Sequence, residues 1–210
     1  MASSTTTSSF TPDSALDLLF SPDLISDDVK KSLHPDVHVR LMSATPLTDQ
    51  PTNTFMRPQI RPLASTDYTR GHLNVLSVLT AAPDPGAAAW LSHFNALRAQ
   101  PRTYYTLVIV HKRSDQIVGV GTVFLERKFQ RGLSLVGHIE DIAVDEKQQG
   151  NKLGLRIIQA LTYISENSGA YKTILNCSDK NIPFYQKCGY EKKENEMARY
   201  TPERAHTPKL

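Results

Sequence analysis

The chain has 210 residues and a mass of 23.4 kDa, which fits one domain with an extension. Hydrophobic residues make up 40% and charged residues 21%, so the chain can bury a core and is not wholly disordered. No apolar run reaches the roughly 18 residues of a membrane-spanning helix, and no membrane insertion is expected. Two cysteines cannot form a disulfide framework, so we expect a reduced, cytoplasmic protein.

Charge is distributed unevenly along the chain. Residues 1–29 hold five aspartates and no base, so the remaining residues carry all 24 basic and 16 acidic residues, a net charge of +8. This excess favours an anionic small ligand or a polyanion, although an ordinary solvated surface explains it equally well. No basic stripe is interleaved with aromatic residues, and the histidines lack metal-ligand spacing. We therefore expect neither a nucleic-acid partner nor a metal.

Residues 1–50 are interpreted as an N-terminal extension. Its first fourteen residues include nine Ser or Thr, and most of the extension is expected to be disordered. The apolar cluster in residues 15–25 is expected to dock on the body. The start of the chain has no apolar h-region and no arginine before Arg40, so neither a secretory signal nor a transit peptide is expected. A linker rich in Pro and Thr, 43–58, leads into a domain at 57–200, and 201–210 is a tail.

The first half of the domain begins with a short strand, 59–63. A Ser or Thr cap predicts a helix from about residue 66 to Thr80. A Pro-Asp-Pro-Gly turn at 83–86 follows, and apolar residues spaced three to four apart predict a second helix over 87–99.

The hydrophobic period then changes from helical to alternating. Residues 104–110, 117–126 and 133–144 read as three strands, joined by a hairpin at 112–116 and a turn at 129–132. Such short connections predict an antiparallel meander.

The last part of the domain predicts a β-α-β unit. A long helix at 153–167 leads to a strand at 171–177, which should therefore run parallel to the strand before the helix. A short helix at 181–188, ended by a glycine, and a last strand at 190–200 follow. The fold class expected is α/β (α+β), with a mixed, largely antiparallel sheet flanked by helices.

The loop before the long helix is a candidate phosphate cradle. It reads Gln-Gly-Asn-Lys-Leu-Gly over 149–154, and a helix N-terminus offers unpaired N–H groups and partial positive charge. Neither P-loop nor Rossmann spacing is present. Taken alone, a glycine loop before a helix is a weak signal, and ordinary turn chemistry explains it better than cofactor binding does.

Three segments together resemble the GNAT superfamily of acetyl-CoA-dependent N-acetyltransferases. They are 139–144, Ile-Glu-Asp-Ile-Ala-Val; 149–154, which fits Q/R-x-x-G-x-G/A except that Lys152 replaces the middle glycine; and 181–190, with its Phe-Tyr-x-Lys-x-Gly-Tyr ending. With Glu-Arg-Lys at 126–128, the match narrows to the glucosamine 6-phosphate N-acetyltransferases, in a fungal form. The resemblance implies a sheet whose two middle strands splay at a β-bulge.

The resemblance also implies an activity. It implies transfer of the acetyl group of acetyl-CoA to the amine of D-glucosamine 6-phosphate, directly in a ternary complex, within UDP-N-acetylglucosamine biosynthesis. It further implies a homodimer with shared active sites. The alternatives are acetylation of another amine, on a protein lysine or a polyamine, and a non-catalytic CoA-binding module. The positive charge of the body argues mildly for an anionic acceptor.

Three residues are the candidates for chemistry. Glu140 is the first choice for the base, and Asp141 should face the opposite side of the strand by alternation, although either carboxylate can be structural. Tyr185 is suited to donate a hydrogen bond or a proton to the CoA sulfur, because the pKa of a thiol lies below that of a phenol. A backbone N–H near Ile142 or Ala143 is the candidate donor to the oxyanion.

Binding residues are assigned by the resemblance alone. Those for acetyl-CoA are Ile142, Ala143, Val144, Gln149, Gly150, Asn151, Lys152, Leu153, Gly154, Leu155, Asn176, Asn181, Phe184 and Tyr185. Those for the sugar phosphate are Thr80, Lys128, Phe129, Gln130, Arg131, Glu140, Asp141, Ile142, Tyr171, Lys172 and Arg199. Of the remaining reactive groups, His138 is expected to be a satisfied core histidine. Cys177 is expected to be a buried, inert thiol rather than an acyl carrier.

Overall fold

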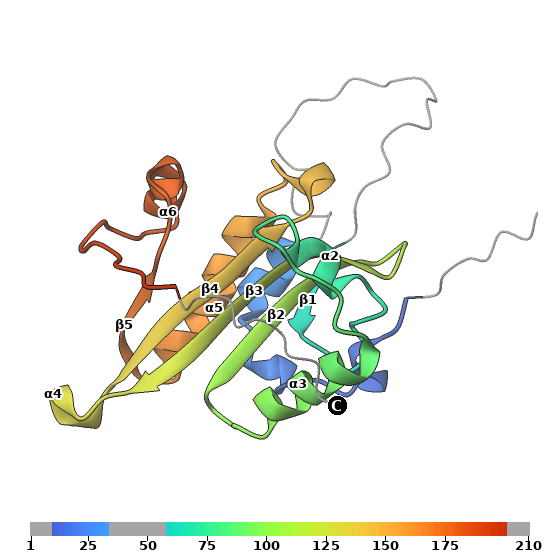
Figure 1. The fold of residues 1–210 in the computed structure, drawn as a ribbon, viewed down its shortest axis with the longest axis horizontal. Helices are drawn as coiled ribbons and strands as arrows, with labels where there is room; N and C mark the ends of the chain where they lie inside the picture. Colours follow the sequence, from blue (N-terminus) through green and yellow to red (C-terminus); the bar gives the residue numbers. More distant parts are fainter. Residues whose placement is uncertain (1–9, 34–57, 201–210) are drawn as a thin grey trace, which may run out of the picture. The chain divides into compact units, whose positions relative to one another are not determined.

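The computed structural model describes residues 10–33 and 58–200. This part of the chain falls into two compact units that divide between Leu175 and Asn176, and each is described by itself. The first unit holds a five-stranded sheet in the order β1-β2-β3-β4-β5 (Figure 1). Its strands are β1 (Pro58–Pro62), β2 (Tyr104–His111), β3 (Gln116–Arg127), β4 (Leu135–Val144) and β5 (Ala170–Leu175). The first four are antiparallel to their neighbours and β5 is parallel to β4, which confirms the predicted mixed sheet.

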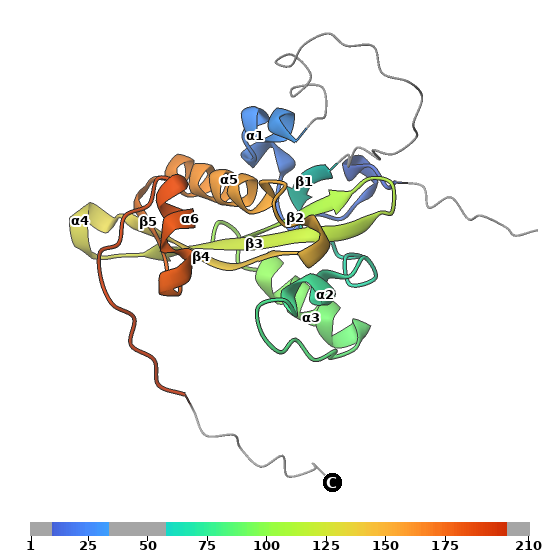
Figure 2. The same ribbon diagram turned by 90° about the horizontal axis from the view of Figure 1, so that it is seen from above.

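Helices cover both faces of this sheet (Figure 2). The α-helices are α1 (Asp27–Ser32), α2 (His72–Leu76), α3 (Ala87–Arg98), α4 (Gln130–Leu133), α5 (Leu153–Asn167) and α6 (Ile182–Lys187). The 3-10 helices are η1 (Asp13–Ala15), η2 (Pro22–Leu24), η5 (Glu146–Gln148) and η6 (Asp179–Asn181). Helix α5 lies on one face, while α2 and α3 lie on the other. Of the described helices, none is long and apolar enough to span a membrane.

Two cores result from this layering. Between the sheet and α2–α3, a buried cluster includes Trp90, Phe94, Val108 and Val110. On the opposite face α5 buries an apolar stripe that includes Ile157 and Leu161. Helix α5 approaches β3 so closely that a Cβ on Gly121 would lie 2.4 Å from Ile157, so only glycine fits that position without a shift.

Strand β4 contains the predicted bulge. Val120 of β3 pairs with Ala143 and Thr122 pairs with Glu140, so two steps along β3 match three along β4. Asp141 takes a left-handed backbone conformation with φ 57°. The extra residue and the positive φ are the features of a β-bulge, which bends the strand that contains it.

The N-terminal segment 10–33 packs against the β1 side of the first unit. Leu18 forms a β-bridge with Ala64, and the Leu19 N–H donates to the Leu63 carbonyl at 2.8 Å. Ile25 is 1% exposed, and α1 contacts α5. This segment therefore contributes to the core of the first unit.

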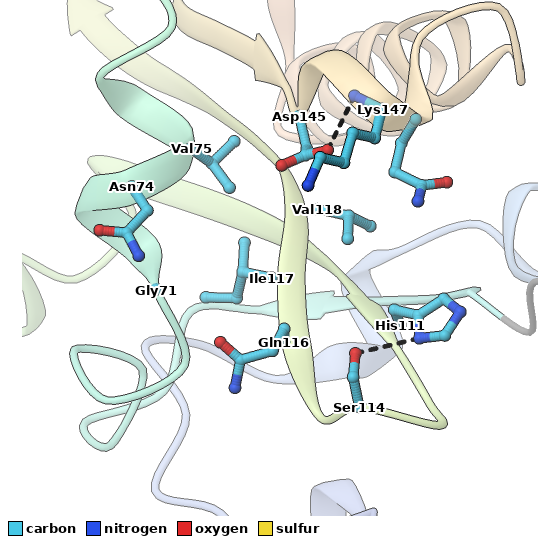
Figure 3. A pocket seen from close by; sticks show the side chains of 11 residues that line it. Gly71, Asn74, Val75, His111, Ser114, Gln116, Ile117, Val118, Asp145 and Lys147 are labelled. Atoms are coloured by element: carbon cyan, nitrogen blue, oxygen red, sulfur yellow. Dashed lines mark hydrogen bonds between the residues drawn. The ribbon is translucent and has the colours of Figure 1, made fainter.

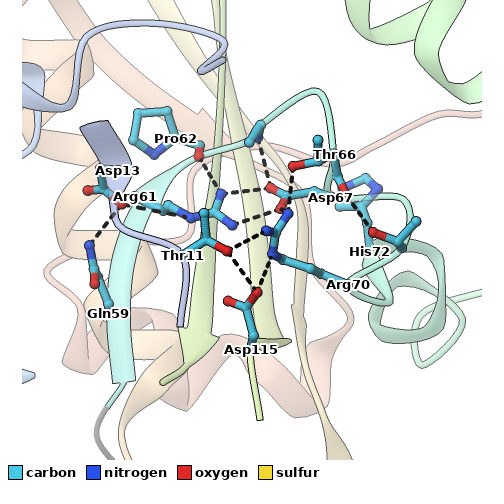
Figure 4. A network of polar contacts seen from close by, with 12 residues as sticks. Thr11, Asp13, Gln59, Arg61, Pro62, Thr66, Asp67, Arg70, His72 and Asp115 are labelled. Carbon is cyan, nitrogen blue, oxygen red and sulfur yellow. Dashed lines mark hydrogen bonds and ion pairs between the residues drawn. The ribbon is translucent and has the colours of Figure 1, made fainter. Parts of the chain in front are cut away.

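A polar network joins the segment to β1 and to the turn after it (Figure 4). Arg61 and Asp67 are almost fully buried and form two hydrogen bonds of 2.7 Å. Arg70 contacts Asp67, Asp115 and Thr11, which belongs to the N-terminal segment. Every charge in this network faces an opposite one, as buried ions require.

Two predicted elements are wrong. The helix expected from residue 66 to 80 is only α2, because residues 66–71 form successive turns and Gly71 takes φ 80° at the helix start. The strand expected at 190–200 is absent: these residues have no regular secondary structure. A strand needs a neighbouring strand to accept its hydrogen bonds, and the described residues of the second unit contain none. The predicted tail at 201–210 and most of the linker at 43–58 lie outside the described residues.

Candidate active site

The sheet opens between β4 and β5. Parallel pairing runs from Leu135 with Ala170 to Ile139 with Leu175 and stops there. Strand β4 continues to Val144, and from Asp141 onward it has no strand partner on the β5 side among the described strands. Backbone N–H and C=O groups on that side are therefore available to a ligand that lies along the strand.

The loop that follows β4 leads into α5 with a left-handed turn. Lys152 is the N-cap of α5 and takes φ 60°, and Gly150 takes φ 83°. Asn151 donates to the Gln148 carbonyl, and Gln149 donates to the Val144 carbonyl. Lys152 therefore adopts the kind of backbone conformation that glycine provides at this position of the family pattern, and the departure in sequence leaves the left-handed turn in place.

The bulge changes how the predicted carboxylates are assigned to faces. A Cβ on Gly137 would meet Ser165 of α5, and a Cβ on Gly121 would meet Ile142 as well as α5, so Gly137 and Ile142 share the α5 side. Simple alternation would put Asp141 there instead. Asp141 is the extra residue of the bulge, so alternation assigns it no face, whereas Glu140 lies on the face opposite α5.

A row of polar side chains continues from Glu140 along that face. Lys128 Nζ lies 2.5 Å from Glu126 Oε1, and His138 Nε2 lies 2.9 Å from Glu126 Oε2. The hydrogen bond from Lys128 holds the pKa of the Glu126 carboxyl below its usual value, and the hydrogen bond from His138 adds a smaller effect in the same direction. The His138 ring stacks on Phe124 at 4.5 Å and 12°.

The turn between β3 and β4 holds a second group of predicted residues. Arg131 lies over the Tyr171 ring at 4.8 Å, and the Lys172 ammonium lies 5.9 Å from the centre of the same ring. Arg131 and Leu133 have positive φ, while Phe129 and Leu133 are 95% and 71% exposed. The structure thus brings together Arg131, Tyr171 and Lys172 at the hairpin tip.

Thr80 lies apart from these groups, in the loop between α2 and α3. Tyr68 Oη donates to the Asp84 carboxylate at 2.9 Å, and the Gly86 N–H donates to Asp84 Oδ1 at 2.8 Å. These hydrogen bonds hold the end of the loop that precedes α3.

The remaining predicted residues belong to the second unit. Tyr185 packs edge-on against Phe184 at 5.0 Å, and its ring centre lies 6.5 Å from that of Tyr190. Gly189 takes φ 92° and ends α6, as predicted. Asn176 and Asn181 precede α6, and Arg199 lies outside any strand.

A hollow of about 420 Å³ lies elsewhere on the first unit (Figure 3). It is bounded by α2, by the β2–β3 hairpin and by the segment after β4, with Asn74, Gln116 and Asp145 among its polar residues. None of the predicted site residues lines it. A hollow built from three distant segments leaves no local pattern in a sequence.

Two predictions about reactive side chains are wrong. His138 is not a core histidine: its side chain is 22% exposed and paired with Glu126. Its place in the interior of a strand indicated burial, but β4 is only partly covered on this face. Cys177 is exposed, since β5 ends at Leu175, before the cysteine. The Glu126–His138 pair is the feature that sequence reasoning missed, although alternation puts both residues on one face.

The comparisons with known proteins agree on one family. Residues 71–200 match the acetyltransferase (GNAT) domain. Glucosamine 6-phosphate N-acetyltransferase 1 of Dictyostelium discoideum is 39% identical over 68% of this chain and 90% of its own length. The enzyme of that name from Candida albicans is 37% identical over 65% of this chain and 93% of its own. The crystal structure of the Arabidopsis thaliana enzyme superposes with a TM-score of 0.68 at 32% identity, covering 69% of this chain and 99% of that one. The chain therefore belongs to the GNAT family of acetyltransferases, and these relatives within it are glucosamine 6-phosphate N-acetyltransferases.

Proposed function

We propose that this chain transfers the acetyl group of acetyl-CoA to the amine of D-glucosamine 6-phosphate, giving N-acetyl-D-glucosamine 6-phosphate and CoA. The observation that carries the proposal is the end of β4–β5 pairing at Ile139, directly before the carboxylates and the loop at the start of α5. The names of the relatives supply the acceptor.

The residues present fit acetyl-CoA. The unpaired side of β4 can hydrogen-bond a pantetheine amide, and N–H groups in the loop before α5 can meet a pyrophosphate. A Cβ on Gly150 would have nothing within 4 Å, so the loop is open there to an incoming phosphate. When bound, acetyl-CoA supplies an acetyl group activated as a thioester.

Glu140 is placed to act as the base. It lies where β4 leaves β5 and faces the side of the sheet opposite α5, and an ionised carboxylate can take a proton from an ammonium directly or through one water. A backbone N–H near Ile142 or Ala143, beyond the bulge, is oriented by β4 and can stabilise negative charge on the acyl oxygen. Asp141 holds the bulge conformation between these two groups.

Tyr185, which belongs to the second unit, is our candidate for the donor to the leaving thiolate. A phenol has a higher pKa than a thiol, so the Tyr185 hydroxyl keeps its proton and stabilises the thiolate by donating a hydrogen bond. Cys188 in the same unit is a poor nucleophile, since burial raises the pKa of its thiol. An acyl intermediate on Cys188 is therefore disfavoured, and direct transfer in a ternary complex is the route that we propose.

Cations along the sheet face suit the sugar phosphate. The Lys128 ammonium contacts Glu126 of β3, which also contacts His138, two residues before Glu140 on β4. A substrate whose amine meets Glu140 would extend its phosphate towards Lys128. This alignment favours an anionic sugar over a cationic peptide or polyamine as acceptor.

A second copy of the chain is the expected partner. The hairpin tip exposes Phe129 and Leu133, and residues 190–200 lack a strand to pair with inside their own unit. Exposed apolar tips, and segments without a partner strand, are features that an interface between two copies buries. We expect light scattering to give a dimer, and the double variant Phe129→Ser/Leu133→Ser to weaken it.

The test of the function is release of CoA from acetyl-CoA by the purified chain. Glucosamine 6-phosphate should support turnover, and glucosamine, a lysine peptide and spermidine should be poorer acceptors by at least tenfold in kcat/KM. Glucose 6-phosphate, which has no amine, is the matched control and should give no turnover. Equal rates with glucosamine, or turnover only with the peptide, would contradict the proposal.

A further inference from the structure

The Glu126–His138 pair, on the sheet face opposite α5, has the geometry of an oriented base. Each oxygen of the Glu126 carboxylate has its own partner, Lys128 Nζ at 2.5 Å and His138 Nε2 at 2.9 Å. A carboxylate only accepts hydrogen bonds, so the hydrogen in the second contact belongs to Nε2. A neutral His138 therefore keeps Nδ1 as its proton-accepting atom.

Packing fixes the direction of this ring while leaving it in reach of water. His138 stacks on Phe124 at 4.5 Å, and its side chain is 22% exposed. A carboxylate that orients an imidazole through one nitrogen also stabilises the cation formed when the other nitrogen is protonated. The pair thus has both an orienting partner and an exit to solvent.

The register of the sheet puts this pair beside Glu140. His138 faces Phe124 and Glu140 faces Thr122 across the same two strands, so both side chains lie on one face. Two residues along a strand lie about 7 Å apart at the backbone, and side chains of this length can bring their polar atoms within reach of a shared water. The charged groups on this face around His138 are Glu126 and Lys128 from β3 and its turn, Glu140 from β4, and Lys172, whose partner on β4 is Val136.

The reaction releases one proton that these groups must handle. An acceptor enters as an ammonium, R–NH3+, and leaves as an amide. The nitrogen lone pair forms the C–N bond, the C–S bond breaks with its electrons going to sulfur, and the thiolate takes one proton. Of the two protons lost by the nitrogen, one ends on the thiol and the other must reach solvent. Glu140 alone would have to return its proton to bulk water before each new turnover.

We propose that His138, oriented by Glu126, receives this proton from Glu140 through water and passes it to solvent. This inference rests on the proposed function. Glu126 acts through His138 and is a positioning residue, while His138 acts through Glu140.

The experiment compares kcat at saturating substrates from pH 5.5 to 8.5 for the wild-type chain and His138→Gln. At pH 5.5 the two proteins should be equally fast, because a protonated imidazole has no free site to accept a proton. At pH 8 the wild-type chain should be roughly tenfold faster, less than the 10²–10⁴ of a direct acid–base group. His111→Gln, the same substitution at the end of β2, is the matched control and should follow the wild-type profile.

Two further measurements separate a proton route from a structural role. Free imidazole should raise kcat of His138→Gln several-fold, but not of His111→Gln. Glu126→Gln should move the acid limb of the profile to lower pH, because the imidazolium loses its counter-charge. A rate lowered by one factor at every pH, without rescue by imidazole, overturns the inference. If the wild-type chain fails to acetylate glucosamine 6-phosphate, it is the proposed function that fails.

Discussion

The two edges of the sheet use their polar groups in opposite ways. At the β1 edge, the N-terminal segment bridges Ala64, and Arg61 and Asp67 bury a two-hydrogen-bond ion pair. At the β5 edge, pairing ends at Ile139 and β4 runs on without a strand partner on that side among the described strands. Both are edges of one sheet, but the first is closed by its own chain and the second is left for a ligand.

The two edges differ because one supports the stability of the fold and the other supports its function. An exposed strand edge invites unwanted pairing, so a protein closes or covers it unless it is needed. The β1 edge is covered by residues 10–33, far away in sequence: residues 17–19 pair with residues 63–65, just beyond β1, and Asp13 contacts Gln59 and Arg61. The β5 edge is opened by a bulge at Asp141, which bends β4 away from its neighbour. Substitutions at the closed edge should therefore change stability, and those at the open edge should change turnover.

The largest effect is expected at the closed edge. Arg61→Met removes one partner of a fully buried pair and leaves Asp67 with fewer counter-charges, which should cost about 3–5 kcal/mol of unfolding free energy. Urea unfolding measures the loss. The double variant Arg61→Met/Asp67→Asn should recover part of it, because the buried Asp67 carboxylate is then replaced by a neutral amide. A loss below about 1 kcal/mol would show that this pair does not close the edge.

At the open edge, Glu140→Gln should change turnover and leave stability almost unaffected. We expect kcat to fall about 100-fold or more while the unfolding free energy stays within about 1 kcal/mol, since Glu140 is exposed. Acetyl-CoA affinity, measured by calorimetry, should be retained. Glu146→Gln, an exposed carboxylate in η5, is the matched control and should turn over normally. A loss of stability equal to that of Arg61→Met would erase the contrast between the edges.

Local patterns were enough to predict the sheet, and they failed where the partner was distant or absent. The meander and the β-α-β unit follow from alternation, short turns and the helical period of α5, which are properties of adjacent residues. The helix expected at 66–80 failed because Asp67 is taken into the pair with Arg61 and Gly71 turns left-handed. The strand expected at 190–200 failed because a strand depends on a neighbour that the segment does not contain.

The residues of the candidate site were also predicted only in part. The resemblance supplied Glu140, the loop before α5 and Lys128, and the structure groups the first and last of these on one sheet face. The face of Asp141 could not be predicted, because one inserted residue reverses alternation beyond it. The Glu126–His138 contact was missed since it joins two strands at a register that only the bulge and the turn determine.

Acid should lower the unfolding free energy through His72, a buried histidine of α2. Trp90 Nε1 donates to His72 Nδ1 at 3.2 Å, and His72 Nε2 is buried without a partner among the described residues. Burial lowers the pKa of this imidazole from 6.5 to about 4. Between pH 6.5 and pH 4 the imidazole is protonated in the unfolded chain but stays neutral in the folded chain. The folded state therefore loses up to ~3 kcal/mol of stability as the pH falls from 6.5 to 4.

The measurement is the unfolding free energy at pH 7 and at pH 4.5. His72→Gln should flatten the difference between the two values, although it lowers stability at pH 7. His93→Gln, an exposed histidine of α3, should keep the wild-type difference. The opposite result, a full pH difference in His72→Gln, would assign acid sensitivity to other groups.

The smallest effect concerns two left-handed positions, at the start of α2 and at the start of α5. At the start of α2 the positive φ is taken by Gly71, which is unstrained, whereas at the start of α5 it is taken by Lys152, which is not. A left-handed non-glycine residue costs roughly 1–2 kcal/mol. Lys152→Gly should therefore relieve strain, offset in part by greater freedom of the unfolded chain, for a net change within about 1 kcal/mol. Lys152→Val removes the same charge but places a β-branched residue where it fits worst. Calorimetry with acetyl-CoA should give weaker binding for Val than for Gly, because only the former distorts the loop. Equal weakening in both would mean that the lysine charge, and not the backbone turn, is what the open edge needs.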